Sequence, residues 1–447
     1  MYHTIAAIAT AHSIGSISIV RLSGKDALAI ALKLSQKKEL SPRYAALTPL
    51  YDTNDILIDE AIVIYFQNPK SFTGEDVVEF QCHGGMIVAQ SVLRACVDAG
   101  ARLAQPGEFS KRAFLNGRLD LTQAEAIASL IEAKSDDAAR ILARQMKGEL
   151  REYVESIRDS LLEILAYSEV VIDYAEEDLP SDVVDQIVGK LEKIKNELSR
   201  TLESSRRRSG LMQGYRVAII GKPNVGKSSL LNSLLDYERA IVSEIAGTTR
   251  DTIEEQVRIG THLIRLVDTA GIRDAHDEIE RIGIERSIAA IDNADMVIAL
   301  FDSSREMDDE DNAIIDLIDQ YSQSKPFICI LNKVDLPKIF PDENLKKYSP
   351  IALSCKEDTD ILIDALSHVM DHDNDSEEMM LISQRQISAT SDTLVAIDEA
   401  YEPLQSGELE FFSFHINQAI RSLSSITRPY ELDEMFDKMF GQFCLGK

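Results

Sequence analysis

A phosphate-binding pattern lies near the middle of the chain. Residues 221–228 read G-x-x-x-x-G-K-S, between an apolar stretch at 217–220 and a helix-like stretch at 229–235. The pattern requires this setting, because inward-turned backbone N–H groups and the positive end of a helix together hold phosphate oxygens. We expect Lys227 to reach the β- and γ-phosphates and the Ser228 hydroxyl to hold Mg²⁺. The nucleotide contacts predicted from this loop are Asn224, Val225, Gly226, Lys227, Ser228 and Ser229.

Three further motifs follow in the order that a GTPase requires. Asp268-Thr269-Ala270-Gly271 ends an apolar stretch, where a carboxylate suits the Mg²⁺ site and Gly271 lets its N–H approach a γ-phosphate. Asn332-Lys333-Val334-Asp335 ends another, and such an N-K-x-D set reads guanine because its carboxylate accepts from base donors that adenine lacks. Ser354-Cys355-Lys356 is placed to donate a backbone N–H to the guanine O6. Each motif alone could be an ordinary turn, but all of them in order predict a GTP-binding domain.

A threonine pair lies between the phosphate loop and Asp268. We expect Thr249 to complete the Mg²⁺ shell when GTP is bound and to leave after hydrolysis, with Thr248 as the alternative. An ordinary polar loop is the competing interpretation, which the position of the pair in the domain disfavours. The nucleotide contacts predicted here are Ser243, Glu244, Ile245, Ala246, Gly247, Thr248 and Thr249.

The glutamine that orients water in Ras-like enzymes is missing. Ile272 occupies that position, so hydrolysis needs another orienting group and another positive charge. An arginine supplied in trans is one source of charge. A monovalent cation held by Asn224 and by carbonyls of residues 243–249 is another. The acidic stretch 277–280 could orient the water, although the residues alone favour a solvated helix start there.

The composition indicates an acidic protein of several domains. A length of 447 residues predicts two to four domains, and a net charge of −28 repels nucleic acid at long range. Any RNA contact must therefore be local or supplied by a partner. The arginine cluster at 206–208 is expected to be solvated linker or surface. Scattered cysteines and the lack of a secretory signal or a membrane-length apolar run favour a cytoplasmic location.

Hydrophobic spacing divides the chain into four segments, which predicts a multidomain fold. Short strand-like and helix-like runs in residues 1–118 indicate an α+β domain, and residues 119–210 are helical from a capping box at Thr122 to Glu125. Residues 211–378 form the α/β GTPase domain of Ras-like type. Residues 379–447 are again helical and too short for a large core, so we expect them to pack on 119–210, with the GTPase domain inserted. Their predicted apolar face consists of Phe411, Phe412, Phe414, Ile416 and Ile420.

This order of segments resembles the MnmE family of tRNA modification GTPases, also called TrmE, over essentially the whole chain. The matching motifs are V-R-L-S-G at 20–24, V-E-F-Q-C-H-G-G at 78–85, F-L-N-G-R-L-D-L at 114–121, D-E-I-E-R-I-G at 277–283 and the terminal C-L-G-K. The terminal motif is the most distinctive of these.

The resemblance implies a cytosolic GTPase that forms a homodimer and works with a flavin-dependent partner of the MnmG type, which carries FAD. Together they would add an aminomethyl or carboxymethylaminomethyl group to carbon 5 of the wobble uridine of certain tRNAs. No membrane is involved. A reduced folate, 5-formyl- or methylene-tetrahydrofolate, would supply the one-carbon unit. By motif position, the folate pocket would contain Arg21, Glu79, Arg118 and Lys447.

The resemblance also implies which groups supply positive charge and orient the attacking water in place of the missing glutamine. Potassium would bind at Asn224, Ser243, Ile245 and Thr248, and Glu280 would orient the attacking water through a second water. Cys444 would serve redox or covalent chemistry or, equally, pack as a small residue near the folate.

Two other functions compete with tRNA modification. A ribosome-assembly GTPase shares every nucleotide motif, but it would carry a G-x-x-G RNA-binding module after the GTPase domain, and no such module is evident in the sequence. A regulatory switch without chemistry of its own is the second alternative, which folate binding would exclude.

Overall fold

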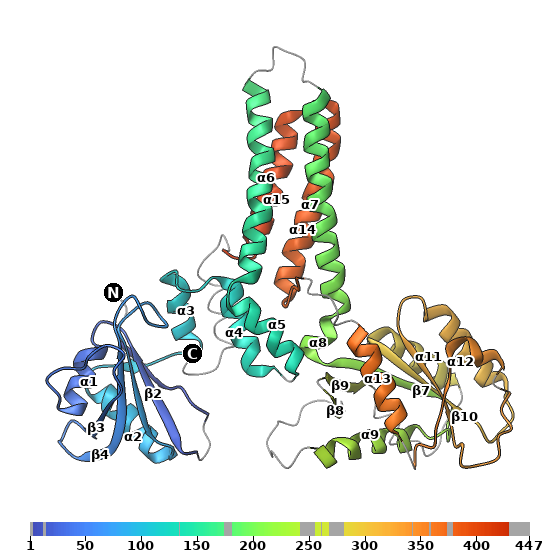
Figure 1. The fold of residues 1–447 in the computed structure, drawn as a ribbon, viewed down its shortest axis with the longest axis horizontal. Helices are drawn as coiled ribbons and strands as arrows, with labels where there is room; N and C mark the ends of the chain where they lie inside the picture. Colours follow the sequence, from blue (N-terminus) through green and yellow to red (C-terminus); the bar gives the residue numbers. More distant parts are fainter. Residues whose placement is uncertain are drawn as a thin grey trace. The chain divides into compact units, whose positions relative to one another are not determined.

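The computed structural model describes residues 3–11, 15–133, 135–173, 181–241, 255–260, 262–267, 281–341, 343–356, 359–372 and 379–428 (Figure 1). Internal contacts divide the chain into two compact units. The first comprises residues 1–131, 143–195 and 388–447, and the second comprises residues 132–142 and 196–387. The helices α5 (Asp136–Met146) and α7 (Ser181–Arg207) pass from one unit into the other.

The first unit begins with a six-stranded sheet in the order β3-β4-β5-β2-β1-β6. Its strands are β1 (Ile5–Ile8), β2 (Ile17–Ser23), β3 (Ala46–Tyr51), β4 (Leu57–Phe66), β5 (Val77–His83) and β6 (Arg102–Leu103). Neighbours are antiparallel except β1 and β6, which are parallel. The helices α1 (Ala27–Ser35) and α2 (Met86–Asp98) cover one face, where alternate strand residues such as Val20, Val63 and Phe80 complete the core. Sheet and helices are thus combined in this region, as the sequence predicts.

Helix α3 (Glu108–Leu115) covers one end of the opposite face of this sheet, where its Phe109 packs on Ile5 and Ala7 together with Phe72. Strand β3 escapes prediction from the sequence, because Pro49 interrupts its apolar pattern. The strand forms nonetheless because it lies at the edge of the sheet, where a missing N–H need not break the hydrogen-bond ladder.

Helices follow the sheet domain. They are α4 (Leu121–Glu132), α5, α6 (Glu149–Asp173) and α7, and, near the end of the chain, α14 (Gln384–Ser406) and α15 (Leu409–Ser424). The capping box predicted at Thr122 and Glu125 is wrong. The Asp120 carboxylate accepts from the Gln123 backbone N–H, and the Gln123 side chain accepts from the Asp120 N–H, both at 3.0 Å. The same reciprocal pattern therefore starts two residues earlier, since a carboxylate at Asp120 is an equally good acceptor.

The last segment packs on the earlier helices, as expected. Helix α15 lies along α6, where the Ser168 and Ser413 hydroxyls are 3.2 Å apart, and Lys195 of α7 forms an ion pair of 2.6 Å with Asp398 of α14 (Figure 1). The predicted apolar face of α15 is partly wrong. Phe412 and Ile416 are buried, whereas Phe411 and Phe414 are 60% and 63% exposed, because a helix cannot bury residues 411, 412 and 414 on one narrow side.

The arginine cluster at 206–208, predicted to be solvated linker or surface, belongs to a helix and is only partly at the surface. Helix α7 continues through Arg207, Arg206 is exposed and Arg208 is buried. The linker interpretation is therefore wrong, and the surface interpretation holds for Arg206.

The second unit contains a doubly wound sheet in the order β12-β11-β10-β7-β9-β8. Its strands are β7 (Tyr215–Gly221), β8 (Glu255–Ile259), β9 (His262–Val267), β10 (Met296–Asp302), β11 (Phe327–Asn332) and β12 (Ile351–Ala352). All neighbours are parallel except β8 and β9.

Helices cover both faces of this sheet. Helices α8 (Ser209–Gln213), α9 (Lys227–Ile241) and α13 (Asp360–His372) supply one core, and α11 (Arg281–Asn293) and α12 (Asp309–Tyr321) supply the other; a 3-10 helix, η1 (Glu343–Tyr348), adds Leu345 to the second core. The carboxyl ends of the parallel strands β7, β10, β11 and β12 meet at one edge, which is where open α/β sheets bind ligands.

The two neighbouring phenylalanines of α15 provide a matched test of this packing. We expect Phe412→Ala to lower the free energy of unfolding by about 3–5 kcal/mol, because its side chain is fully buried. Phe411→Ala should change that free energy by no more than about 0.5 kcal/mol, since its ring is largely in water. Urea unfolding followed by circular dichroism measures both, and equal effects would contradict the assigned faces.

Candidate nucleotide site

The phosphate-loop motif connects β7 to α9, as predicted. Two of its glycines lack room for a side chain: a Cβ at Gly221 would lie 2.6 Å from the Leu300 carbonyl oxygen, and one at Gly226 would lie 2.1 Å from the Asn332 side-chain nitrogen. Gly226 also has φ +108°, a conformation that side chains disfavour. Asn224, at φ 66°, is exposed in the left-handed region, which asparagine tolerates better than most residues. The conformation of this loop at the start of α9 therefore requires glycine at positions 221 and 226.

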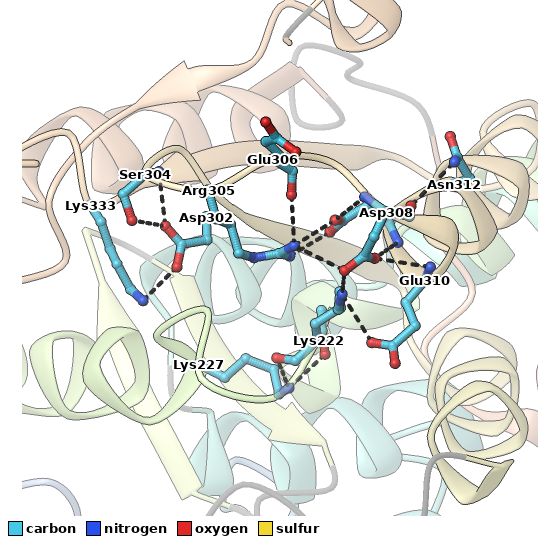
Figure 2. Close-up of polar contacts among 12 residues, drawn as sticks. Lys222, Lys227, Asp302, Ser304, Arg305, Glu306, Asp308, Glu310, Asn312 and Lys333 are labelled. Atoms are coloured by element: carbon cyan, nitrogen blue, oxygen red, sulfur yellow. Dashed lines mark hydrogen bonds and ion pairs between the residues drawn. The ribbon is translucent and has the colours of Figure 1, made fainter. Parts of the chain in front are cut away.

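Lys227 bends back over this loop. Its ammonium donates to the carbonyl oxygens of Gly221 at 2.6 Å and Lys222 at 2.7 Å (Figure 2). Burial disfavours the charged form and lowers the pKa of Lys227 to about 8. The side chain is thus a desolvated cation beside the loop that the sequence assigns to phosphates. Ser228 is exposed in the first turn of α9, next to half-buried Ser229, so its hydroxyl can serve as the oxygen ligand that Mg²⁺ prefers.

Asn332 joins three of the predicted motifs. Its amide nitrogen donates to the Val225 carbonyl oxygen at 2.7 Å, and its amide oxygen accepts from the Cys355 backbone N–H at 3.0 Å. The side chain is buried. One N–H of the Asn332 amide and its amide oxygen thus contact the protein itself, and its predicted part in reading guanine stays a prediction. The Cys355 N–H donates to Asn332, and the donor to guanine O6 predicted for residues 354–356 likewise stays a prediction.

Lys333 and Asp335 extend from the end of β11. The Lys333 ammonium contacts Asp302 at 2.6 Å, and Ser304 donates to the same carboxylate through its hydroxyl at 2.7 Å (Figure 2). Burial opposes ionisation of Asp302, but these hydrogen bonds outweigh it and lower the pKa of the carboxyl. Asp335 is exposed, as a carboxylate that reads a base must be, and so is Lys356, whereas Ser354 is buried. Sequence reasoning missed Asp302, although a carboxylate at the carboxyl end of a buried parallel strand is a signal of this edge.

Several predicted nucleotide-site residues lie outside the described residues. They are Ser243, Glu244, Ile245, Ala246, Gly247, Thr248, Thr249, Asp268, Thr269, Ala270, Gly271 and Glu280, together with Cys444 and Lys447 of the terminal motif. The predictions for these residues remain predictions.

The first unit brings together two of the residues assigned to folate. Arg21 of β2 and Glu79 of β5 are cross-strand partners, and their side chains form an ion pair at 2.8 Å. The Arg21 guanidinium lies 5.5 Å from the ring centre of Phe72 and 5.8 Å from that of Phe109. Arg118 donates to the Ser71 carbonyl oxygen at 3.1 Å, so the loop at 71–75 contacts both arginines. Sequence reasoning missed both phenylalanines. Phe72 is an isolated aromatic residue in a loop and carries no pattern, and Phe109 lies in the short helix α3, whose single buried ring does not mark a binding site.

The fold and the site of the second unit define a P-loop nucleotide-binding protein with an N-K-x-D motif. The family model described as "MnmE helical domain" matches residues 121–444, and "GTP-binding protein TrmE N-terminus" matches residues 4–118. The chain is 64% identical over 444 residues to the tRNA modification GTPase MnmE of Sulfurimonas denitrificans, covering 99% of each chain. It is 60% identical over 444 residues to that of Aliarcobacter butzleri, again covering 99% of each. The chain belongs to the MnmE (TrmE) family of tRNA modification GTPases and is a GTP-hydrolysing enzyme.

None of the described helices combines the length and the apolar composition needed to cross a bilayer.

The lowered pKa of Lys227 predicts a proton uptake on nucleotide binding. At pH 8 the Lys227 amine is neutral in about half of the protein molecules. A phosphate beside this amine favours its charged form. GDP binding should therefore take up about half a proton at pH 8, and affinity should fall as the pH rises above 8. Calorimetry in two buffers of different ionisation enthalpy measures this uptake. Lys227→Arg, whose guanidinium stays charged, should show no such uptake, and an equal uptake in both proteins would refute the assignment.

Proposed function

We propose that this protein hydrolyses GTP to support modification of carbon 5 of the wobble uridine of tRNAs, using a one-carbon unit from a reduced folate. The product would be an aminomethyl or carboxymethylaminomethyl group. The observation that carries this proposal is the Arg21–Glu79 ion pair, whose guanidinium lies close to the rings of Phe72 and Phe109, in the unit that does not contain the nucleotide site. A GTPase that acted only as a switch would not need it.

The pair has the chemistry that a folate requires. The Glu79 carboxylate can accept from the donor edge of a pterin, while Arg21 can donate to a carbonyl or carboxylate. Phe72 offers an apolar surface beside Arg21 for the flat ring. Arg118, and Lys447 from the chain terminus, would contribute positive charge toward the glutamate tail. We propose these residues as the site for 5-formyl- or methylene-tetrahydrofolate.

An open sheet face supports a homodimer. The strand register places Leu47, Ile62, Gln81 and Ile19 in one row, on the face opposite α1 and α2. Leu47 is 63% exposed, and Ile17 on the same face of β2 is 58% exposed. Such an apolar face favours association with a second copy. Because Arg21 and Glu79 lie in the adjacent row, we propose that the folate site is next to the dimer interface.

The domain arrangement that we propose is residues 1–118 for folate binding and dimerisation, 119–210 and 379–447 as the two parts of a helical domain, and 211–378 as an inserted GTPase domain. In the last of these, Ser228 and Thr249 would hold Mg²⁺. Potassium would be held by Asn224 with Ser243, Ile245 and Thr248, and Glu280 would orient water. Bound potassium would supply the positive charge that an arginine delivered in trans supplies in other GTPases. The exposed position of Asn224 is compatible with this role.

We further propose a cytoplasmic location and partners that follow from the chemistry. A flavin-dependent protein of the MnmG type, carrying FAD, would join the homodimer in a heterotetramer or a larger assembly. Since the chain has a net charge of −28, that partner would supply most of the cationic surface that tRNA needs. Cys444 could take part in redox or covalent chemistry, or simply pack near the folate.

The potassium proposal predicts a cation-dependent rate. Single-turnover GTP hydrolysis should be faster in potassium than in sodium at equal ionic strength, and Asn224→Ala should remove this difference. Glu280→Ala should retain GTP binding but lose hydrolysis, because it would act mainly in the transition state. Equal rates in both salts, or a Glu280→Ala protein of normal rate, would mean that other groups perform these roles.

The modification itself is tested by mass analysis of wobble nucleosides from cells with and without this protein. We expect the C5-modified uridine only when the protein is present. Arg21→Met keeps the apolar stem but removes the charge, so it should abolish formyl-tetrahydrofolate binding and the modified nucleoside while GTP affinity stays within about twofold. Modified uridine at normal levels without the protein would reject the proposed function, and normal folate binding by Arg21→Met would reject only the assigned pocket.

A further inference from the structure

A charged segment connects both ends of the nucleotide site. Residues 302–311, which we call the acidic brace, run from the end of β10 into the start of α12 and contain Asp302, Ser304, Arg305, Glu306, Asp308, Asp309, Glu310 and Asp311. Figure 2 shows that its side chains contact a lysine at each end, Lys222 in the phosphate loop and Lys333 in the N-K-x-D motif. None of the sequence motifs includes this segment.

Lys222 has two separate connections. Its ammonium contacts the Asp308 carboxylate and lies 3.2 Å from that of Glu310, and its side chain is only 13% exposed. Burial opposes its charge, but the bonds to Asp308 and Glu310 outweigh this and raise the pKa of Lys222. Its carbonyl oxygen accepts from Lys227 at 2.7 Å. The Lys222 side chain is therefore anchored to the acidic brace, while its backbone carbonyl holds the ammonium of Lys227.

The anchor for Lys222 is itself rigid. Asp308 is the N-cap of α12 and accepts from the backbone N–H groups of Glu310 and Asp311. Arg305 holds Asp311 through both its terminal nitrogens at 2.8 Å and reaches Asp308 at 3.3 Å. Because Asp311 is fully buried, this bidentate pair fixes the start of the helix in the core. The opposite end of the brace is fixed by the contact of Asp302 with Lys333.

We infer that Lys222 is a positioning residue for guanine-nucleotide binding, acting through Asp308 of the acidic brace. The ion pair holds the first half of the phosphate loop, and with it the carbonyl oxygens that orient Lys227. Without it, the loop would have to be ordered by the nucleotide at a cost in affinity. The inference rests on the GTPase activity that family membership carries.

The expected size of the effect is modest. Exposed ion pairs contribute little, but Lys222 is mostly buried and belongs to a connected network. A loss of about threefold to tenfold in affinity is therefore expected for both GDP and GTP. Because Lys222 orders the loop rather than contacts a transition state, the KM for GTP should rise by the same factor, with kcat changing by less than about twofold.

The test measures release of a fluorescent GDP analogue from the full-length protein. Lys222→Met keeps the apolar stem and should accelerate release about threefold to tenfold, while Lys222→Arg should restore release to within about twofold. Asp308→Asn keeps a good helix cap but removes the charge, so it should also accelerate release. Asp309→Asn is the matched control: it removes the same charge from the adjacent, exposed residue and should leave release unchanged.

The double variant Lys222→Met with Asp308→Asn decides whether the two residues act together. If they do, its release is no faster than that of the more affected single variant. Unchanged release in Lys222→Met, or single effects that multiply in the double variant, would overturn the inference. If the unmodified protein bound no guanine nucleotide, the assigned class would fail instead, so the two failures are distinguishable.

Discussion

The buried side chain of Asn332 holds the nucleotide site together. Parallel strands bring their carboxyl ends to one edge, but the loops that follow are separate in sequence and each could adopt many conformations. One amide donates to the phosphate loop at Val225 and accepts from Cys355 in the last motif. Its nitrogen also occupies the space that a side chain at Gly226 would need. The glycine and the asparagine are therefore a matched pair, and Asn332 of the N-K-x-D motif has a structural role in joining the loops of this edge.

A second constraint is the placement of positive charge in a strongly acidic chain. Lys227, Lys222 and Lys333 lie at the nucleotide edge, and each is held by a different kind of partner: backbone carbonyls, the carboxylates of the acidic brace, and Asp302. Burial lowers the pKa of Lys227, whose partners are carbonyl oxygens, whereas the carboxylates of Asp308 and Glu310 raise that of Lys222. The lysine that the sequence assigns to phosphates is thus held by carbonyl oxygens and not by a carboxylate.

The two sites that the sequence predicts lie in different units. The nucleotide edge belongs to the second unit, and the Arg21–Glu79 pair belongs to the first. Each site is therefore built by its own sheet: the nucleotide edge by the carboxyl ends of parallel strands, and the ion pair by neighbouring antiparallel strands.

The sequence by itself determined the class of the protein and the position of every described motif on its element. Residues 221–228 connect strand β7 to helix α9, and Asn332 is the last residue of strand β11. The sequence reveals these positions because phosphate loops require spaced glycines and buried parallel strands require apolar runs. The family resemblance also assigned Arg21 and Glu79 to one pocket, and the strand register makes them cross-strand neighbours.

Tertiary structure decided what each side chain contacts. The Asn332 side chain contacts Val225 and Cys355. Asp120, and not Thr122, caps the helix α4. The side chains of Phe411 and Phe414 are exposed, whereas that of Phe412 is buried. Lys222 and Asp308 meet although they are 86 residues apart. Such contacts depend on how strands and helices pack in space. The spacing of residue types along the chain does not contain this information, so the contacts could not be predicted from it.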